Sequence, residues 1–378
     1  MSKRIRILIV IILSLSVLMT ACQPAETTTP EAGEPVNGEE APVGESGPEE
    51  AKETITFADC QWQSLWINNA IAMFIVEHGY GYPVEEVTIS TPVMQQSIVT
   101  DGVQVSMEMW TTNYEEWWNE QQDANKIVGL GDIMESSAQG FYVPRYVIEG
   151  DEERGIEPMA PDLKSVFDLP KYKDLFTDPE DPDKGVIYSC VTGWDCAEVN
   201  RVKVFAYDLD ETFNVGEPGS SGALDAAIAG PYKKGEPVVS YYWEPTWLLG
   251  VYDMVLLEEP EYTDTCWEKI TAITNDNVID ESFTGEDVPE DAGCSYQNAA
   301  VPKAVSAGMA ERNPEVVEFL DKMFIGTGTL NKLSAYMEEN GAEVDEAALW
   351  YLENYEDDWK SWLPEDVVAK VETALANQ

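Results

Sequence analysis

The alternation of short apolar strands with helices, starting at Ile55, is the feature that most constrains the fold. Apolar runs predict strands at 55–58, 87–90 and 103–107, and helical spacing of apolar residues predicts helices over 64–77 and 92–100. This order predicts an α/β fold with a mainly parallel sheet that is covered on both faces. Ligands of such sheets bind beyond the carboxyl ends of the strands. Trp62 and Trp110 follow the first and third strands, so both are candidate ligand-binding residues.

The rest of the chain predicts a second lobe inserted into the first. Strand patterns recur at 185–189 and 238–243, whereas the part from about residue 301 is mostly helical, with helices expected over 314–323, 330–339 and 364–375. We therefore expect lobe 1 to comprise 55–142 and 300–378, and lobe 2 to comprise 143–299. A cleft between two such lobes is a common place for a small-molecule site.

The N-terminus carries a targeting pattern. Lys3, Arg4 and Arg6 precede a short apolar run over 7–17, which is too short to predict a membrane span. The stretch from Leu18 to Cys22 resembles a bacterial lipoprotein signal. This resemblance implies cleavage before Cys22 and lipid attachment to its thiol, which would anchor the protein on the outer face of the cell membrane or in the periplasm. The alternative, an ordinary secretory signal, also predicts export.

Residues 23–54 predict a disordered acidic tether. They are rich in Pro, Glu, Thr and Gly and contain almost no aliphatic side chains, so they bury too little apolar area to offset the entropy of ordering. Like charges along the segment repel one another and extend it. It would connect a membrane anchor to a domain that begins near residue 55.

The net charge of the whole chain is strongly negative. It has 22 Lys+Arg against 71 Asp+Glu, a formal net charge of −49. This charge repels a phosphate backbone and excludes nucleic acid as a partner. Two interpretations remain: a solvated acidic surface suited to high salt, or a field that attracts cationic ligands.

Motifs for catalysis, metals and cofactors are sparse. The chain has one histidine, His78, no Gly-x-Ser-x-Gly elbow, no Walker A motif and no dinucleotide fingerprint. We therefore expect no catalytic residues, no metal and no cofactor. Because Asp and Glu are abundant, a secreted hydrolase that uses a carboxylate pair stays open as the alternative class of function.

The cysteines indicate two disulfides. If Cys22 is lipidated, five cysteines remain in an oxidising compartment. Cys190 and Cys196 would close a seven-residue ring, and Cys266 would pair with Cys294, which leaves Cys60 as a buried free thiol. By chain entropy the short ring contributes only about 2–3 kcal/mol, so we expect its main effect to be local.

The ring would hold Trp194 at the tip of a tight loop, in front of a helix expected over 197–206. Asp195 is expected to cap this helix, with Glu198 three residues later as in a capping box. An indole beside free helix amides offers a π face for a cation and N–H groups for an anion. The alternative is a disulfide-stapled surface loop that carries an incidental tryptophan.

Tryptophans at strand ends and on the pinned loop suggest an aromatic cage. Trp110, Trp194 and Trp243 are three of 12 tryptophans in the chain. A quaternary ammonium group has no N–H to donate, so a protein holds it through aromatic faces. Three converging indoles would box such a cation.

Three stretches resemble the glycine betaine substrate-binding proteins of ABC importers, which take up quaternary amines. The Gly-Trp-Asp-Cys-Ala-Glu run at 193–198 looks like their Gly-Trp-Gly-Cys-Glu signature. The Tyr-Tyr-Trp-Glu-Pro-Thr-Trp-Leu-Leu run at 241–249 is similar to a second signature, and residues 138–142 match the crossing between the lobes. The resemblance covers about residues 55–378.

The resemblance implies a bilobal periplasmic-binding-protein fold of type II and a receptor that is not an enzyme. It would bind glycine betaine, proline betaine or a related quaternary ammonium solute such as choline or carnitine, and deliver it to a membrane permease as a monomer. By motif position the cage falls on Trp110, Trp194 and Trp243, and the amides after Trp194, at Asp195 and Cys196, would receive the ligand carboxylate.

Asp195 stands where the family signature has glycine. If its carboxylate stays near the helix amides, it competes with a ligand carboxylate and favours a cation that lacks one. If it turns to solvent, the backbone alone faces the ligand and glycine betaine remains the first choice.

Overall fold

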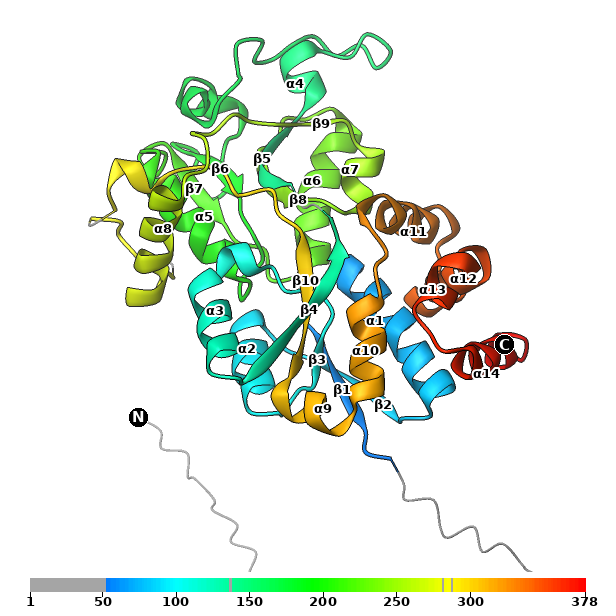
Figure 1. Cartoon of the computed structure of the whole chain (residues 1–378). Helices are drawn as coiled ribbons and strands as arrows, with labels where there is room; N and C mark the ends of the chain where they lie inside the picture. The colour runs from blue at the N-terminus through cyan, green and yellow to red at the C-terminus, as the bar shows by residue number, and fades with distance from the viewer. Residues whose placement is uncertain (1–51, 136–137, 281, 287) are drawn as a thin grey trace, which may run out of the picture. The chain divides into compact units, whose positions relative to one another are not determined.

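The computed structural model describes residues 52–135, 138–280, 282–286 and 288–378 (Figure 1). The expected signal segment, Cys22 and all of the expected tether except residues 52–54 lie outside the described residues. Those three residues belong with the folded part, because Lys52 Nζ donates to the Tyr80 carbonyl at 2.7 Å and Glu53 pairs with Arg312 at 3.2 Å.

Within the described residues the strands form two five-stranded sheets (Figure 1). The order in sheet 1 is β2-β1-β3-β10-β4, and in sheet 2 it is β7-β6-β8-β5-β9. Each sheet with the helices packed on it is called a lobe below. The strands of sheet 1 are β1 (Ile55–Asp59), β2 (Val84–Thr88), β3 (Val105–Ser106), β4 (Ile127–Met134) and β10 (Val301–Ser306). Those of sheet 2 are β5 (Gln139–Pro144), β6 (Gly185–Tyr188), β7 (Phe213–Gly216), β8 (Ser240–Trp243) and β9 (Met254–Leu256).

Lobe 1 follows the predicted alternation closely. β1 is buried along its whole length, as suits a strand with neighbours on both edges, whereas β2 is largely exposed at the edge of the sheet. Helix α1 (Gln63–Ile75) buries a face that includes Leu65, Ile67 and Ile71, and it continues into one turn of π-helix, η1 (Val76–Tyr80). Helix α2 (Thr91–Val99) has Pro92 in its first turn, where the missing N–H costs nothing.

Both sheets are mixed, which differs from the mainly parallel pairing that we expected. β1 pairs with β2 and β3 in parallel, but β10 pairs antiparallel with β3 and β4. In sheet 2, β6 pairs in parallel with β7 and β8, and β5 pairs antiparallel with β8 and β9. The alternation of strands and helices that starts at residue 55 predicts only β1, β2 and β3, which form the parallel half of sheet 1. The returning strand β10 lies in the part that we expected to be mostly helical.

The chain passes from sheet 1 to sheet 2 between β4 and β5, and it returns to sheet 1 with β10. Strand β5 pairs in sheet 2, so residues 139–142 lie in lobe 2, and the boundary is four residues earlier than the one expected after residue 142.

The short helices between β3 and β6 are η2 (Thr111–Asn113), α3 (Glu115–Asp123) and α4 (Arg145–Glu149).

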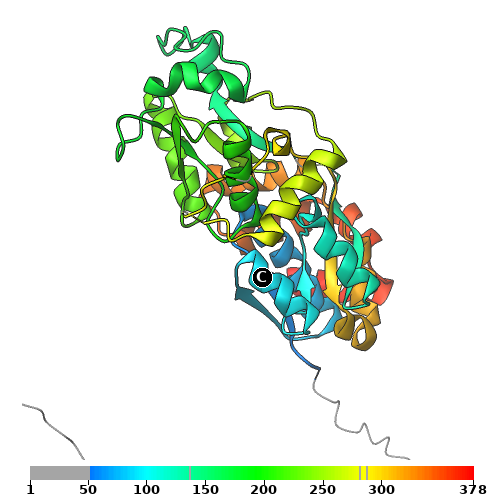
Figure 2. The same ribbon diagram turned by 90° about the vertical axis from the view of Figure 1, so that its left-hand side faces the viewer.

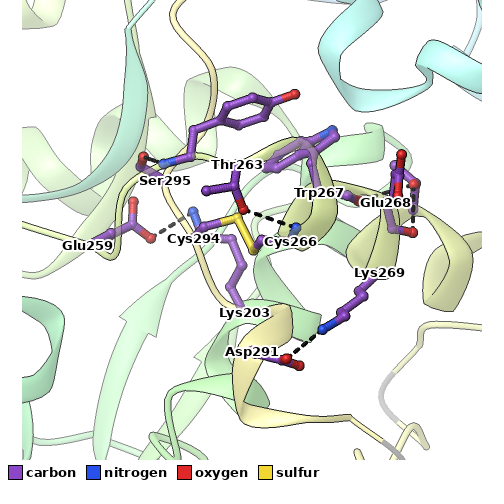
Figure 3. Close-up of a disulfide and its surroundings, with 12 residues drawn as sticks. Lys203, Glu259, Thr263, Cys266, Trp267, Glu268, Lys269, Asp291, Cys294 and Ser295 are labelled. Carbon is purple, nitrogen blue, oxygen red and sulfur yellow. Dashed lines mark hydrogen bonds and ion pairs between the residues drawn. A yellow bond between two sulfur atoms is a disulfide. The ribbon is translucent and has the colours of Figure 1, made fainter.

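Lobe 2 carries both expected disulfides. Cys266 on helix α8 (Asp264–Asp276) is bonded to Cys294 on the segment that leads to β10, and this bond lies near the buried ion pair of Lys203 and Glu259 (Figure 3). The other helices of the lobe are the 3-10 segments η3 (Val166–Leu175) and η4 (Glu290–Ala292), together with α5 (Asp195–Ala206), α6 (Ser221–Lys234) and α7 (Trp247–Val251). Of these, α5 packs on α8 and η4, η3 contacts β6, and α7 packs on α11 (Thr327–Asn340) of the C-terminal part.

The C-terminal helices return to lobe 1. Helix α12 packs on α1, and α14 packs on η1, so the orange-to-red end of the chain lies beside the first helix (Figure 1). Gly79 permits this approach, because a Cβ there would lie 2.8 Å from Val367. The helices are α9 (Ala307–Arg312), α10 (Pro314–Lys322), α11 (Thr327–Asn340), α12 (Val344–Asn354), α13 (Glu356–Ser361) and α14 (Glu365–Leu375).

The two lobes contact each other away from the chain crossings as well. Trp267 Nε1 on α8 donates to the Thr112 carbonyl, and Asn275 Nδ2 donates to Glu116 on α3 at 3.2 Å. Figure 2 shows α8, in yellow, reaching α3, in cyan. No helix in the described part of the chain is long and apolar enough to cross a membrane.

Candidate ligand-binding site

One pocket collects every residue that we predicted to bind ligand. It lies between the lobes, and its walls come from the ends of β1, β3 and β8, the start of β5 and the start of α5. The lining residues are Trp62, Thr91, Trp110, Asn113, Tyr114, Gln139, Trp194, Asp195, Cys196, Tyr241 and Trp243.

Four indoles form a chain of nearly perpendicular rings along this pocket. Trp62 contacts Trp194 with ring centroids 5.4 Å apart, and Trp194 contacts Trp243 at 5.3 Å. Trp62 also meets Trp110 at 6.5 Å. The interplanar angles are 86°, 87° and 89°, so the rings face different directions around the pocket. We call these four residues the indole cage.

Lobe 1 holds its two indoles through a buried carboxylate that we did not predict. Glu108 Oε2 accepts from Trp62 Nε1 at 2.6 Å and from Trp110 Nε1 at 3.0 Å, and Oε1 accepts from Asn68 Nδ2 at 2.8 Å. Glu108 is 1% exposed. Burial raises its pKa to about 7, although the indole and amide donors oppose this shift. The carboxylate therefore fixes the orientation of both rings and places a titratable charge behind them.

Lobe 2 presents Trp194 on the expected loop. The Cys190–Cys196 disulfide closes the ring, and Gly193 adopts a φ of +91° that side chains rarely permit. Two hydrogen bonds then reach across to lobe 1: Trp194 Nε1 donates to the Cys60 carbonyl at 2.8 Å, and the Thr91 amide donates to the Gly193 carbonyl at 3.3 Å. Trp194 is thus both a wall of the cage and a contact that joins the lobes.

Asp195 does not cap α5 as we predicted. The residue in the cap position is Trp194, no side chain caps the helix, and Asp195 is the first helical residue. Asp195 instead lines the pocket, and its Oδ2 accepts from Gln95 Nε2 of lobe 1 at 3.2 Å. Burial, followed by repulsion from Glu198, raises the pKa of Asp195 to about 7. The expected alternative, a side chain turned to solvent, does not describe this position either.

The start of β5 and the end of β8 form the opposite wall. Gln139 and Trp243 are directly opposite each other in the antiparallel pair, and Gln139 Oε1 accepts from Tyr241 Oη at 2.7 Å. Gln139 is 4% exposed, and among the described residues its Nε2 has no hydrogen-bond partner. Sequence reasoning missed this residue, although it lies in the stretch that matched the lobe crossing.

The pocket is suited to a small organic cation. None of the described residues that line it is Lys, Arg or His, and Asp195 and the nearby Glu108 supply negative charge. Aromatic faces attract a quaternary ammonium group that cannot donate hydrogen bonds. The first amides of α5, at Asp195 and Cys196, lack intrahelical acceptors and can donate to an anion. No group of metal-binding side chains is found in the part of the chain that the structure describes.

The remaining cysteine assignments match the structure. Both expected pairs are bonded, and Cys60 is free and buried, with burial raising the pKa of its thiol. Its carbonyl, rather than its sulfur, serves the site by accepting from Trp194.

Two α/β lobes that close a pocket of indoles and polar groups define a bilobal solute-binding protein. The sequence over residues 53–354 matches the family described as the substrate binding domain of an ABC-type glycine betaine transport system (OpuAC). The chain belongs to this family and is a substrate-binding protein.

Relatives and solved structures agree with this assignment. The chain is 22% identical over 320 residues to the trimethylamine N-oxide-binding protein of Pelagibacter ubique (strain HTCC1062), a match that covers 84% of this chain and 93% of the relative. It is 20% identical to the glycine betaine/proline betaine-binding periplasmic protein of Escherichia coli (strain K12), over 83% of this chain and 89% of the relative.

The fold of the chain is similar to that of a solved structure described as an ABC-transporter choline binding protein in complex with choline. The TM-score is 0.62 at 21% identity, over 85% of this chain and 98% of that chain. This likeness confirms the expected bilobal fold. The family works outside the cytoplasm, and the two disulfides fit an oxidising compartment.

Proposed function

We propose that this protein binds a small quaternary ammonium solute of the glycine betaine or choline type between its lobes. The observation that carries the proposal is the indole cage: four tryptophans, two from each lobe, line one pocket whose described residues include no basic side chain. A desolvated cation on such faces gains about 2 kcal/mol or more from each good contact. The bound solute then passes to an ABC permease, and no catalytic step is involved.

Each cage residue has a distinct part in the proposal. Trp62 and Trp110 form the lobe 1 wall, held by Glu108. Trp243 forms the lobe 2 wall, and Trp194 completes the box as the lobes close. The amides of Asp195 and Cys196 are the place for an anionic ligand group. Cation–π contacts from both lobes favour the closed arrangement over an open one, since only closure brings all four faces to one ligand.

Direct titration tests the proposal. Glycine betaine, choline and tetramethylammonium are each titrated into the purified domain by calorimetry, with tryptophan emission followed in parallel. We expect saturable binding of at least one of them, a change in emission, and recovery of the ligand chemically intact. Absence of heat and of any emission change for all three cations would overturn the proposal, and breakdown of the ligand would favour a hydrolase.

Lipid anchoring through Cys22 is proposed from the N-terminal pattern. Mass spectrometry of the mature N-terminus in a bacterial host is expected to find a chain that begins at a lipid-modified Cys22, without the first 21 residues. A Cys22→Ala variant should leave the membrane fraction or stay uncleaved. An unmodified Cys22, or cleavage elsewhere, would contradict the anchor while leaving ligand binding untouched.

A single copy of the chain is proposed to be the binding unit, since both walls of the pocket come from the same chain. The two lobes that form it are residues 55–138 with 300–378, and residues 139–299.

A further inference from the structure

We propose that Asp195, Gln139 and Asn113 form a polar subsite beside the indole cage that selects a quaternary ammonium alcohol over a carboxylate-bearing betaine. The proposal rests on the proposed function and names the substrate class of the same site. Choline is the simplest ligand of this class, with a trimethylammonium head and a hydroxyl two carbons away.

The position of Asp195 supplies the first step. Its side chain lines the pocket together with Trp194 and Cys196, on the first turn of α5. One carboxylate oxygen accepts from Gln95 across the lobes, so the side chain is held at the lobe interface instead of turning to solvent. A carboxylate has acceptor sites on both oxygens, so Asp195 can also accept from a ligand hydroxyl in this pocket.

Two further polar groups of the pocket lack partners in the described part of the chain. Gln139 Nε2 is a buried donor without a partner among the described residues. The Oε1 of the same amide accepts from Tyr241 Oη, which fixes the orientation of the amide. Asn113 Oδ1 is a buried acceptor on the lobe 1 side. A buried polar group without a partner is costly. A ligand hydroxyl can pair with two of these groups, since it donates to either Asp195 or Asn113 and accepts from Gln139.

A ligand carboxylate fits the same subsite badly. The amides at the start of α5 would attract it, but Asp195 already places a negative charge on that first turn and offsets the positive end of the helix dipole. Two carboxylates near one another repel, and the described residues that line the pocket include no Lys, Arg or His to compensate. The trimethylammonium head is attracted by Asp195 in both ligands, so the difference arises at the other end of the molecule.

The ionisation of Asp195 decides how strong this selection is. The titratable groups that interact electrostatically with Asp195 are Glu198 on its own helix and Cys60 and Tyr114 from lobe 1, and Glu108 in turn acts on Cys60 and Tyr114. These groups are acidic or neutral, so they favour protonated Asp195 in the empty site. A bound cation reverses this preference, and selection is therefore tested at about pH 8, where Asp195 is mostly ionised.

The experiment compares choline, glycine betaine and tetramethylammonium by calorimetry on the wild type, Asp195→Asn and Asp195→Gly. The readout is the ratio of choline to betaine affinity, which is independent of the fraction of active protein. We expect the wild type to favour choline by about tenfold or more, and both variants to lower that ratio at least tenfold, as loss of one like-charge contact implies. Glu211→Gln, in the exposed turn before β7 and outside the cage lining, is the control and should keep the ratio.

The outcomes separate the subsite from the cage. A wild type that prefers glycine betaine, or a ratio that both variants leave unchanged, overturns the subsite. Tetramethylammonium has no hydrogen-bonding group, so its binding tests the indole cage alone. If it binds while the ratio of choline to betaine affinity is unchanged in the variants, the proposed function stands and only the subsite is overturned. Failure of all three cations to bind overturns the proposed function itself.

Discussion

Replacing Trp194 by alanine should weaken binding of every quaternary ammonium ligand by about 100-fold. The change removes one indole face from the cage, worth about 2 kcal/mol when the cation is desolvated. It also removes the donor to the Cys60 carbonyl, which joins the lobes and is left without its partner. Calorimetry with choline and glycine betaine measures the loss.

A second variant divides this effect into its two parts. Trp194→Phe keeps an aromatic face but loses the N–H, so we expect a loss of about tenfold, between wild type and alanine. Trp350→Ala is the matched control, because this half-buried tryptophan on α12 stacks on Tyr336 outside the pocket. Its affinity should stay within about twofold of the wild type. If Trp194→Ala binds with wild-type affinity, the indole cage is not the binding site.

The local elements of the fold were predictable because their causes are local. The first helix, the helix that follows Trp194 and three of the C-terminal helices were expected within a few residues of their observed bounds, since apolar spacing and stop residues act over short distances. β10 was missed for the opposite reason. Its partners β3 and β4 lie more than 150 residues earlier in the sequence, and a short strand before a helical region carries no local mark of that pairing.

The residues of the site also differ in whether the local sequence predicts them. Trp194 and Trp243 stand in stretches with a distinctive sequence, and Trp62 and Trp110 follow predicted strands, so all four were placed at the pocket. Glu108 was hidden among 71 acidic residues. Only its apolar neighbours, Met107 and Met109, mark it as a buried acid, and its role depends on an indole 46 residues away.

Asp195 shows where the local argument fails. Asp before a helix is a common cap, and the capping pattern with Glu198 favoured that interpretation. The helix begins at Asp195, two residues earlier than expected, and the carboxylate accepts from Gln95, which is 100 residues away in the sequence. The other lobe determines where a side chain at the lobe interface points. A short sequence motif holds no information about that lobe, so it cannot predict the direction.

Replacing Glu108 by glutamine should change both the pH dependence of stability and the affinity for cations. Burial raises the pKa of Glu108 from its ordinary 4.5 to about 7, so the folded protein holds this proton more firmly than the unfolded chain does. The stabilising contribution is complete below about pH 4.5 and is lost as the pH rises through 7. For one buried carboxyl this amounts to about 2–3 kcal/mol of unfolding free energy between pH 5 and pH 8.

Urea unfolding of the ligand-free protein at a series of pH values measures this contribution. Other acidic groups also change wild-type stability with pH, so the difference between wild type and Glu108→Gln is the quantity of interest. We expect the wild type to lose about 2–3 kcal/mol relative to the variant over this range. A difference that stays constant with pH would show that Glu108 does not titrate there.

The same substitution should weaken cation binding by about tenfold at pH 8. An ionised Glu108 accepts from the indole N–H groups of Trp62 and Trp110, which strengthens those hydrogen bonds and increases the negative potential of the ring faces that meet the cation. Glutamine keeps one acceptor oxygen but brings an NH₂ group toward three N–H donors. Asp225→Asn is the control: this carboxyl in lobe 2 also has a raised pKa through burial, but it accepts from Tyr242 and Trp247 outside the cage. If Asp225→Asn weakens binding as much as Glu108→Gln, the weaker binding results from the loss of any buried charge. It would then not depend on the hydrogen bonds from Trp62 and Trp110 to Glu108.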